Sequence, residues 1–148
     1  MASWADIIPI IADRLQTVNS GLTVVAYYSD SLTVGVDGVA EIGPRSGENE
    51  INTEKAITAG NVYVHYGTVT LYVACNVEDV AQNLMQRYMS PGDAYSVADA
   101  LWVLWPELAT VAEKIILSPS RGYGKILRAN EILFTNSWDF AVWAAAGT

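Results

Sequence analysis

The chain has 148 residues, of which 51% are apolar and 16% are charged, and its formal net charge at pH 7 is −8. This apolar content excludes a chain that is disordered over most of its length, and the excess of acidic residues argues against an extended contact with nucleic-acid phosphates. The length fits one domain with its own hydrophobic core.

Several kinds of site are disfavoured by what the sequence lacks. It has no run of about 18 apolar residues that would form a membrane-spanning helix, and its first residues do not resemble a signal peptide. The single cysteine, Cys75, allows neither an internal disulfide nor a cysteine-based zinc site, and we expect it to be a buried small hydrophobe. The single histidine, His65, is expected to be half-exposed in a strand. No metal or cofactor is therefore expected.

An amphipathic helix is predicted over residues 7–18, because apolar side chains recur there at spacings of three and four. Asp6 is the expected N-cap, which places Pro9 in the first turn, where a backbone N–H has no helical partner to lose. Gly21 is expected to end the helical segment.

A strand is predicted over residues 23–28, which are rich in β-branched and aromatic types. Apolar residues then alternate with other types up to Asp37-Gly38, and a second apolar run follows over 39–42. Asp-Gly between two such runs is typical of a tight turn, so the sequence predicts a hairpin there.

Residues 43–60 form a long polar stretch without periodicity. A structureless loop of this length is uncommon in a compact domain, and such loops are often functional or ordered by a partner. The alternative interpretation is a solvated surface loop. Its carboxylates lie beside basic residues, so a metal site is not predicted there.

The strongest strand signal covers residues 61–75. Apolar residues occupy even positions up to Tyr66 and odd positions from Val69, so the buried face changes around Gly67-Thr68. We therefore expect a bulge or a tight turn at that point.

A helical region follows. Asn76, with Asp79 three residues later, is expected to cap a first helix that Pro91-Gly92 ends. Asp93 is expected to cap a second helical run that continues to Pro106 and places Trp102 and Trp105 in the core.

The last third is predicted to be β again, with strands over residues 114–117 and 125–134 joined by a turn at 119–122. Residues 138–148 are more apolar than a free C-terminal tail should be. We expect this segment to be an edge strand or an arm that packs on another surface.

Patterns that carry catalysis are missing. The sequence has no Gly-x-Ser-x-Gly nucleophile elbow, and the glycine-rich segment over residues 121–125 lacks the spacing of a phosphate-binding loop. We therefore do not expect an enzyme. Taken together, the signals predict a single α+β domain over residues 1–148, with a mostly antiparallel sheet packed by the N-terminal helix and the central helical region.

The order of these elements resembles the tail terminator and tail completion proteins of long-tailed bacteriophages. The likeness is carried by the short helix over 7–18, by the strand over 69–75 that passes directly into the helix from Asn76, and by the strand over 114–117 that leads into a hairpin. It covers most of the chain and rests on element order and size.

The resemblance implies a structural virion protein that forms a homo-oligomeric, hexameric ring in the neck of the phage. Such a ring caps the tail tube, joins it to the head connector proteins, and lets genomic DNA pass without specific binding. An acidic channel lining would repel the phosphates. By analogy, the polar loop and the C-terminal arm would make ring contacts. The expected contact residues are Arg45, Glu48, Glu50, Trp138, Phe140 and Trp143, and the expected channel-facing residues are Glu48, Glu50 and Glu54.

Three alternatives stay open. The chain is also compatible with another tail or connector protein, such as a tube or adaptor protein. A small ligand- or peptide-binding module would use the aromatic surface instead. An acid-base enzyme would use the loop carboxylates and would require Glu50 for turnover.

Overall fold

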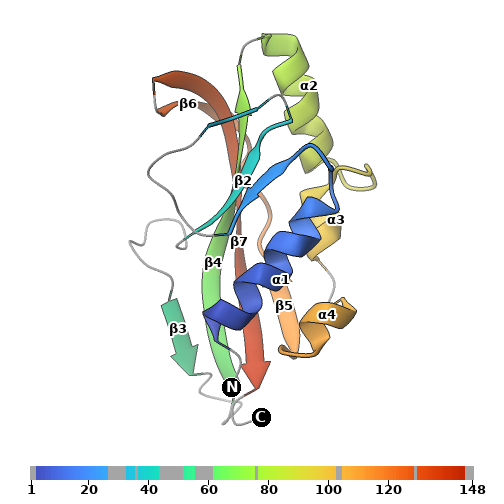
Figure 1. Ribbon diagram of the computed structural model, residues 1–148, viewed down its shortest axis with the longest axis vertical. Coiled ribbons are helices and arrows are strands. Elements are labelled where there is room, and N and C mark those ends of the chain that lie inside the picture. Colours follow the sequence, from blue (N-terminus) through green and yellow to red (C-terminus); the bar gives the residue numbers. More distant parts are fainter. Residues whose placement is uncertain are drawn as a thin grey trace.

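The computed structural model describes residues 3–26, 33–35, 37–43, 52–55, 62–75, 77–102, 105–128 and 130–145. Helices pack against a seven-stranded, mostly antiparallel sheet (Figure 1). The α+β class predicted from the sequence is confirmed.

The elements follow one another in an order close to the predicted one. The helices are α1 (Trp4–Gln16), α2 (Glu78–Met89), α3 (Val97–Leu101) and α4 (Pro106–Ala109). The strands are β1 (Thr23–Val25), β2 (Val39–Gly43), β3 (Asn52–Lys55), β4 (Val62–Ala74), β5 (Lys114–Leu117), β6 (Gly124–Arg128) and β7 (Glu131–Ala145).

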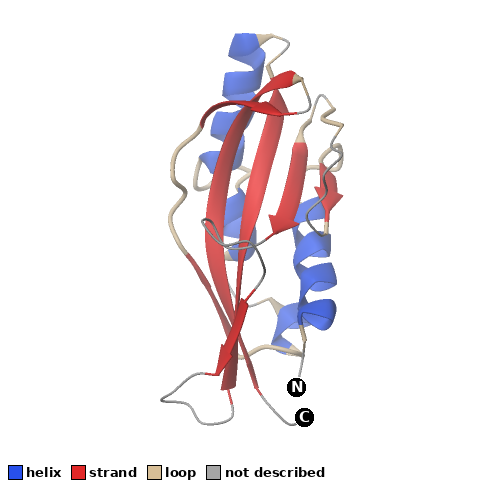
Figure 2. Cartoon of the chain, turned by 90° about the vertical axis from the view of Figure 1, so that its left-hand side faces the viewer, coloured by secondary structure: helices blue, strands red, loops and turns tan. Residues whose placement is uncertain are grey.

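Two long antiparallel strands form the centre of the sheet. Every residue of β4 pairs with β7, from Val62 opposite Ala145 to Ala74 opposite Leu133. The sheet order is β1-β2-β4-β7-β5. β3 pairs with the same edge of β4 as β2 does, and β6 pairs with the same edge of β7 as β5 does. The long pair therefore spans the whole sheet (Figure 2).

The predicted stripe of α1 is the part of the helix that enters the core. Ile7, Ile8, Ile11 and Leu15 are fully buried, and each such side chain contributes about 2 kcal/mol on burial. The predicted N-cap is wrong by one turn. Ser3 precedes the helix, and its backbone N–H donates to the Asp6 carboxylate at 2.8 Å, so Asp6 closes a capping box from inside the first turn.

The predicted Asp37-Gly38 hairpin is wrong. Residues 33–35 are not a strand, and β2 runs parallel to β1, with Thr23 opposite Val39. Gly38 still has a φ of 91°, and a Cβ at this position would lie 2.7 Å from the carbonyl oxygen of Tyr72. The Asp37-Gly38 dipeptide thus marks a turn that leads into β2, but it does not join two antiparallel strands.

The predicted bulge at Gly67-Thr68 is also wrong, because the pairing of β4 with β7 is unbroken across these residues. The apolar residues of β4 change from even to odd positions for another reason. Val69 and Val73 face the helices, whereas Val64 is buried on the opposite face of the sheet in a second, smaller apolar cluster. The sheet therefore buries apolar side chains on both faces.

The C-terminal segment is not an arm over its described part. Residues 138–145 belong to β7, which lies between β4 and β5, and Trp138 and Phe140 are each 2% exposed in the main core. Gly67 makes room for this packing, because a Cβ there would lie 2.8 Å from the Phe140 ring. Trp138 and Phe140 are therefore corrected from contact residues to core residues, and residues 146–148 lie outside the described part.

The central helical region is shorter than predicted. Asn76 lies outside the described residues, and α2 begins at Glu78. Ser96, not Asp93, caps α3 by accepting a hydrogen bond from the Asp99 backbone N–H at 3.1 Å. Trp105 is buried as expected, but Trp102 is 63% exposed because it follows the end of α3.

A buried polar network ties the segment after α1, the helix α2 and the turn before β2 together. Asn19 donates from Nδ2 to the Tyr88 hydroxyl at 3.0 Å, and that hydroxyl donates to the Asp37 carbonyl oxygen at 2.5 Å. Burial raises the pKa of Tyr88 to about 12, so the hydroxyl stays protonated and keeps its donor.

The predicted turn at 119–122 and the strand over 125–134 need correction. Residues 118–123 run along β7, where the Ser118 backbone N–H donates to the Asp139 carbonyl oxygen at 2.8 Å. The hairpin turn lies later, between β6 and β7, and Asn130 has a φ of 62° there. Asparagine tolerates this left-handed conformation better than most residues.

Of the helices in the described ranges, none has the length and apolar character needed to cross a membrane.

Candidate functional site

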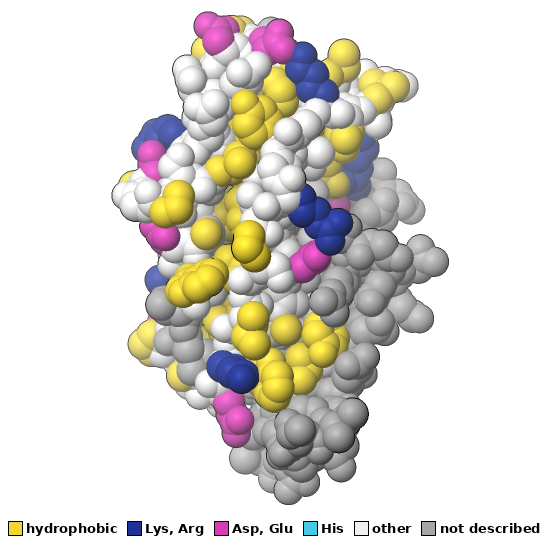
Figure 3. All heavy atoms as spheres, turned by 180° about the vertical axis from the view of Figure 1, so that it is seen from behind, with side chains coloured by type: hydrophobic (Ala, Val, Ile, Leu, Met, Phe, Trp, Pro, Cys, Tyr) yellow, Lys and Arg dark blue, Asp and Glu magenta, His cyan; other side chains and the backbone are white. Residues whose placement is uncertain are grey.

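The face of the sheet opposite α1 is called the back face here. By the strand pairing it carries the side chains of Tyr66, Thr68 and Tyr72 from β4 and of Asp139 and Trp143 from β7. Figure 3 shows the molecule from this side, with apolar side chains gathered in several places. Its two ends differ in chemistry.

The upper end of the back face is closed by a buried ion pair. Arg128 of β6 lies 3.2 Å from the Glu41 carboxylate of β2 and stacks 4.9 Å from the centre of the Tyr72 ring. Glu41 is only 3% exposed. Since β6 and β2 lie on opposite sides of the central strand pair, the β6–β7 hairpin must bend over the back face to make this contact (Figure 2).

A second polar cluster lies halfway along this face. Asp139 accepts a hydrogen bond from the Thr68 hydroxyl at 2.6 Å and pairs with Arg121 at 2.7 Å. The pair anchors the connection between β5 and β6 to the sheet. These polar groups are thus used to hold the structure together.

The lower end is apolar and partly open, and it contains Trp143, which is less deeply buried than the other two predicted contact residues that the structure describes. Here Trp143, Tyr66 and Ala141 are each half-buried and pack against the buried Val64. Ile116 of β5 pairs with Ala141 and is 47% exposed. We call these five residues the Trp143 patch.

A cation sits on this patch. The Lys114 ammonium lies 4.1 Å from the centre of the Trp143 ring, which is a cation–π contact. Lys114 forms no ion pair within the described part of the chain, even with the neighbouring Glu113. The Trp143 Nε1 is buried and has no hydrogen-bond partner among the described residues. Apolar contacts and the lysine therefore hold the indole in place.

Four other predicted site residues have side chains that the structure does not describe. Arg45, Glu48 and Glu50 lie outside the described residues. Glu54 belongs to β3, where its backbone pairs with Val64, and its side chain also lies outside the described part.

His65 is buried, contrary to the prediction of half exposure. It is 2% exposed and lies 5.5 Å from the ring of Trp4, on the helix side of β4. The apolar residues next to His65 in the sequence lie on the other face of β4, so they did not indicate that the face carrying His65 is buried. Cys75 is partly exposed, and burial raises the pKa of its thiol, which disfavours a reactive thiolate.

A second apolar surface was missed by the sequence analysis. It lies at the opposite end of β7 from Trp143, where α2 begins and the β6–β7 hairpin turns. Its side chains are all more than half exposed: Val77 (56%), Val80 (58%), Leu127 (73%) and Ile132 (58%). We call it the hairpin-end patch. The Asn130 turn could have indicated it, because it places Leu127 opposite Ile132.

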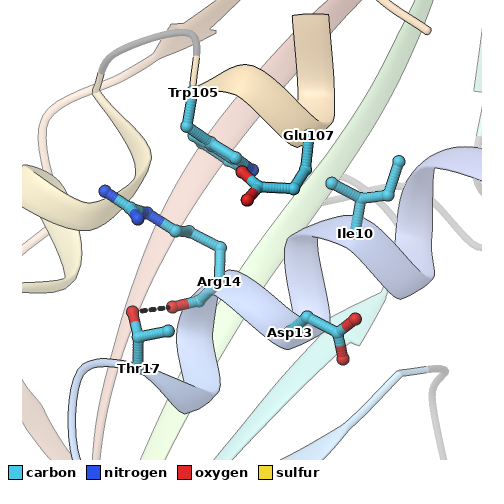
Figure 4. Close-up of a pocket in the computed structure, with 6 residues that line it drawn as sticks. All are labelled: Ile10, Asp13, Arg14, Thr17, Trp105 and Glu107. Carbon is cyan, nitrogen blue, oxygen red and sulfur yellow. Dashed lines mark hydrogen bonds between the residues drawn. The ribbon is translucent and has the colours of Figure 1, made fainter. Parts of the chain in front are cut away.

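A cavity of about 310 Å³ lies between α1 and α4 (Figure 4). Arg14 extends across it, donates from Nε to the Ala100 carbonyl oxygen at 3.1 Å, and stacks 5.4 Å from the centre of the Trp105 ring. Asp13 and Glu107 also line it. The cavity offers charged groups, the Thr17 hydroxyl and an aromatic wall.

Within the described ranges, no three His, Cys, Asp or Glu side chains come together in a way that would hold a metal ion.

Comparison with known proteins adds no assignment. No protein-family model matches the chain, and no curated protein matches its sequence.

Proposed function

We propose that this chain is a non-catalytic structural protein that assembles with copies of itself through the Trp143 patch. The observation that carries the proposal is an aromatic and aliphatic surface with a stacked lysine that has no ion-pair partner in the described part of the chain. Tryptophan, tyrosine and aliphatic side chains of this kind form the energetic centres of protein interfaces.

The use of polar groups supports a structural role. Glu41, Glu78 and Asp139 each pair with an arginine or a lysine and connect elements of the fold. Carboxylates engaged in this way are not poised as a general acid or base.

The specific role we propose is that of a tail terminator or neck protein of a long-tailed bacteriophage. The N-terminal helix, the long strand that leads into α2, and the closing β6–β7 hairpin support the resemblance on which this role rests. The protein would form a hexameric ring in the virion, between the tail tube protein and the head connector proteins. A net charge of −8 per copy suits a channel through which DNA passes without binding.

The first experiment measures native mass over a range of concentrations by light scattering and native mass spectrometry. We expect the wild-type protein to form a discrete ring, visible by electron microscopy, and Trp143→Ala to weaken its assembly at least about tenfold. Trp102→Ala is the matched control, because it removes an exposed tryptophan outside the patch.

A wild-type protein that stays monomeric at every concentration would contradict self-assembly. Equal assembly by the Trp143→Ala variant would instead contradict the role of the patch. Antibody labelling at any position other than the head-proximal end of the tail would overturn the neck assignment.

Ligand binding is a second candidate, and the cavity beside Arg14 favours it. Because Trp105 forms one wall, a ligand there would change tryptophan fluorescence. Arg14→Met would remove such a response and leave the native mass unchanged.

A further inference from the structure

The hairpin-end patch is formed by the start of α2 and by the β6–β7 hairpin. The Cys75 backbone N–H donates to the Ile132 carbonyl oxygen at 3.2 Å, which extends the β4–β7 pairing to within three residues of α2. An ion pair between Lys125 and Glu78 joins β6 to the first turn of the helix. The start of α2 and the β6–β7 hairpin therefore lie at the same end of the molecule (Figure 1).

Two exposed acidic residues lie at this end of the molecule, Asp79 in the first turn of α2 and Glu131 at the start of β7. Asp79 follows Val77 and Glu78 at the start of the helix, whereas Glu131 lies opposite Arg128 on the other face of the hairpin from Ile132. Neither carboxylate forms an ion pair with another described residue. Two basic side chains described near this patch, Lys125 and Arg128, are already paired with Glu78 and Glu41.

The Trp143 patch has the opposite unpaired charge. Its central cation is Lys114, which stacks on the indole, as described above. The two patches are separated by the length of β7 from Ile132 to Trp143, which is about 35 Å at the usual rise of a strand. They cannot contact each other within one copy of the chain.

We infer that the occupant of the Trp143 patch is the hairpin-end patch of a second copy of this chain. The contact places the aliphatic side chains of one copy on the aromatic surface of the next, and Asp79 or Glu131 beside Lys114. This inference rests on the self-assembly proposed above and names the surface that completes it.

Charge favours this contact over a symmetric one. Two Trp143 patches facing each other would bring together two Lys114 ammonium groups, and two hairpin-end patches would bring together four unpaired carboxylates. Like charges facing each other across an interface are costly. A contact between two different patches is heterologous, and it generates a closed ring when the rotation between copies closes.

A charge-exchange experiment tests the inference. The full-length variants Lys114→Glu and Glu131→Lys are purified separately and then mixed, with native mass spectrometry as the readout. Each variant alone is expected to assemble at least about tenfold more weakly than the wild type. The mixture is expected to recover assembly, because every contact then pairs a lysine with a glutamate. Asp79→Lys is a second partner for Lys114→Glu, in case the reversal at the hairpin prevents folding.

Glu107→Lys, on α4, is the matched control, because it reverses an exposed carboxylate outside both patches. At about 150 mM salt, where repulsion between whole copies is largely screened, its assembly should equal that of the wild type. Single variants that assemble like the wild type, or mixtures with either partner that do not recover, would overturn the heterologous contact. If Trp143→Ala abolishes assembly while neither mixture recovers it, this inference alone fails. If Trp143→Ala has no effect on assembly, both this inference and the proposed assembly surface fail.

Discussion

At the scale of single residues, the Tyr88 hydroxyl connects two distant parts of the chain through hydrogen bonds. It accepts from Asn19 and donates to the Asp37 carbonyl oxygen, and the side chain is fully buried. Tyr88→Phe would leave a buried amide donor and a buried carbonyl without this partner. We expect the free energy of unfolding to fall by about 1–3 kcal/mol, as measured by urea denaturation.

Tyr123→Phe is the control for this variant. Tyr123 is only half-buried and contacts the Phe134 ring edge-on at 5.7 Å, so the same chemical change removes no buried hydrogen bond. It should alter the free energy of unfolding by less than about 0.5 kcal/mol. Equal losses from both variants would contradict the structural role of the network.

At the scale of elements, the β6–β7 hairpin depends on the Arg128–Glu41 ion pair. Arg128→Met would leave the Glu41 carboxylate buried without its cation, which costs about 3 kcal/mol or more. We expect that loss in the free energy of unfolding, together with faster amide hydrogen exchange over residues 124–135. Arg87→Met breaks the exposed pair with Asp93 and should cost less than about 1 kcal/mol. A similar cost for both variants would contradict the closure of the hairpin over the back face.

The elements also show what the sequence could and could not predict. α1 was predictable because its stripe depends only on spacing along the chain. The partners of the strands were not, since Asp37-Gly38 is a local signal, whereas the parallel pairing of β1 with β2 depends on distant backbone contacts. The change of parity in β4 was seen correctly but assigned to a bulge, because alternation alone does not reveal that a sheet is covered on both faces.

At the scale of the whole molecule, the candidate site was predicted only in part. The apolar run over residues 138–145 was recognised as unusual, and Trp143 was among the expected contact residues. Trp138 and Trp143 lie five positions apart and so point to opposite faces of β7, but only the pairing shows which face is buried. The hairpin-end patch joins residues from α2 and β6 that are far apart in sequence, and spacing along the chain does not connect them.

The net charge of the whole molecule should govern how assembly responds to salt. Copies that each carry a charge of −8 repel one another over the Debye length, which is about 30 Å at 10 mM salt and about 8 Å at 150 mM. A contact between Lys114 and a carboxylate acts over a few ångströms and is screened less. The association constant from light scattering should therefore rise several-fold between these two concentrations. The rise should be smaller for Glu107→Lys, which carries less negative charge and leaves both patches intact. A steady fall in association would instead mean that attraction between unlike charges outweighs the repulsion between whole copies.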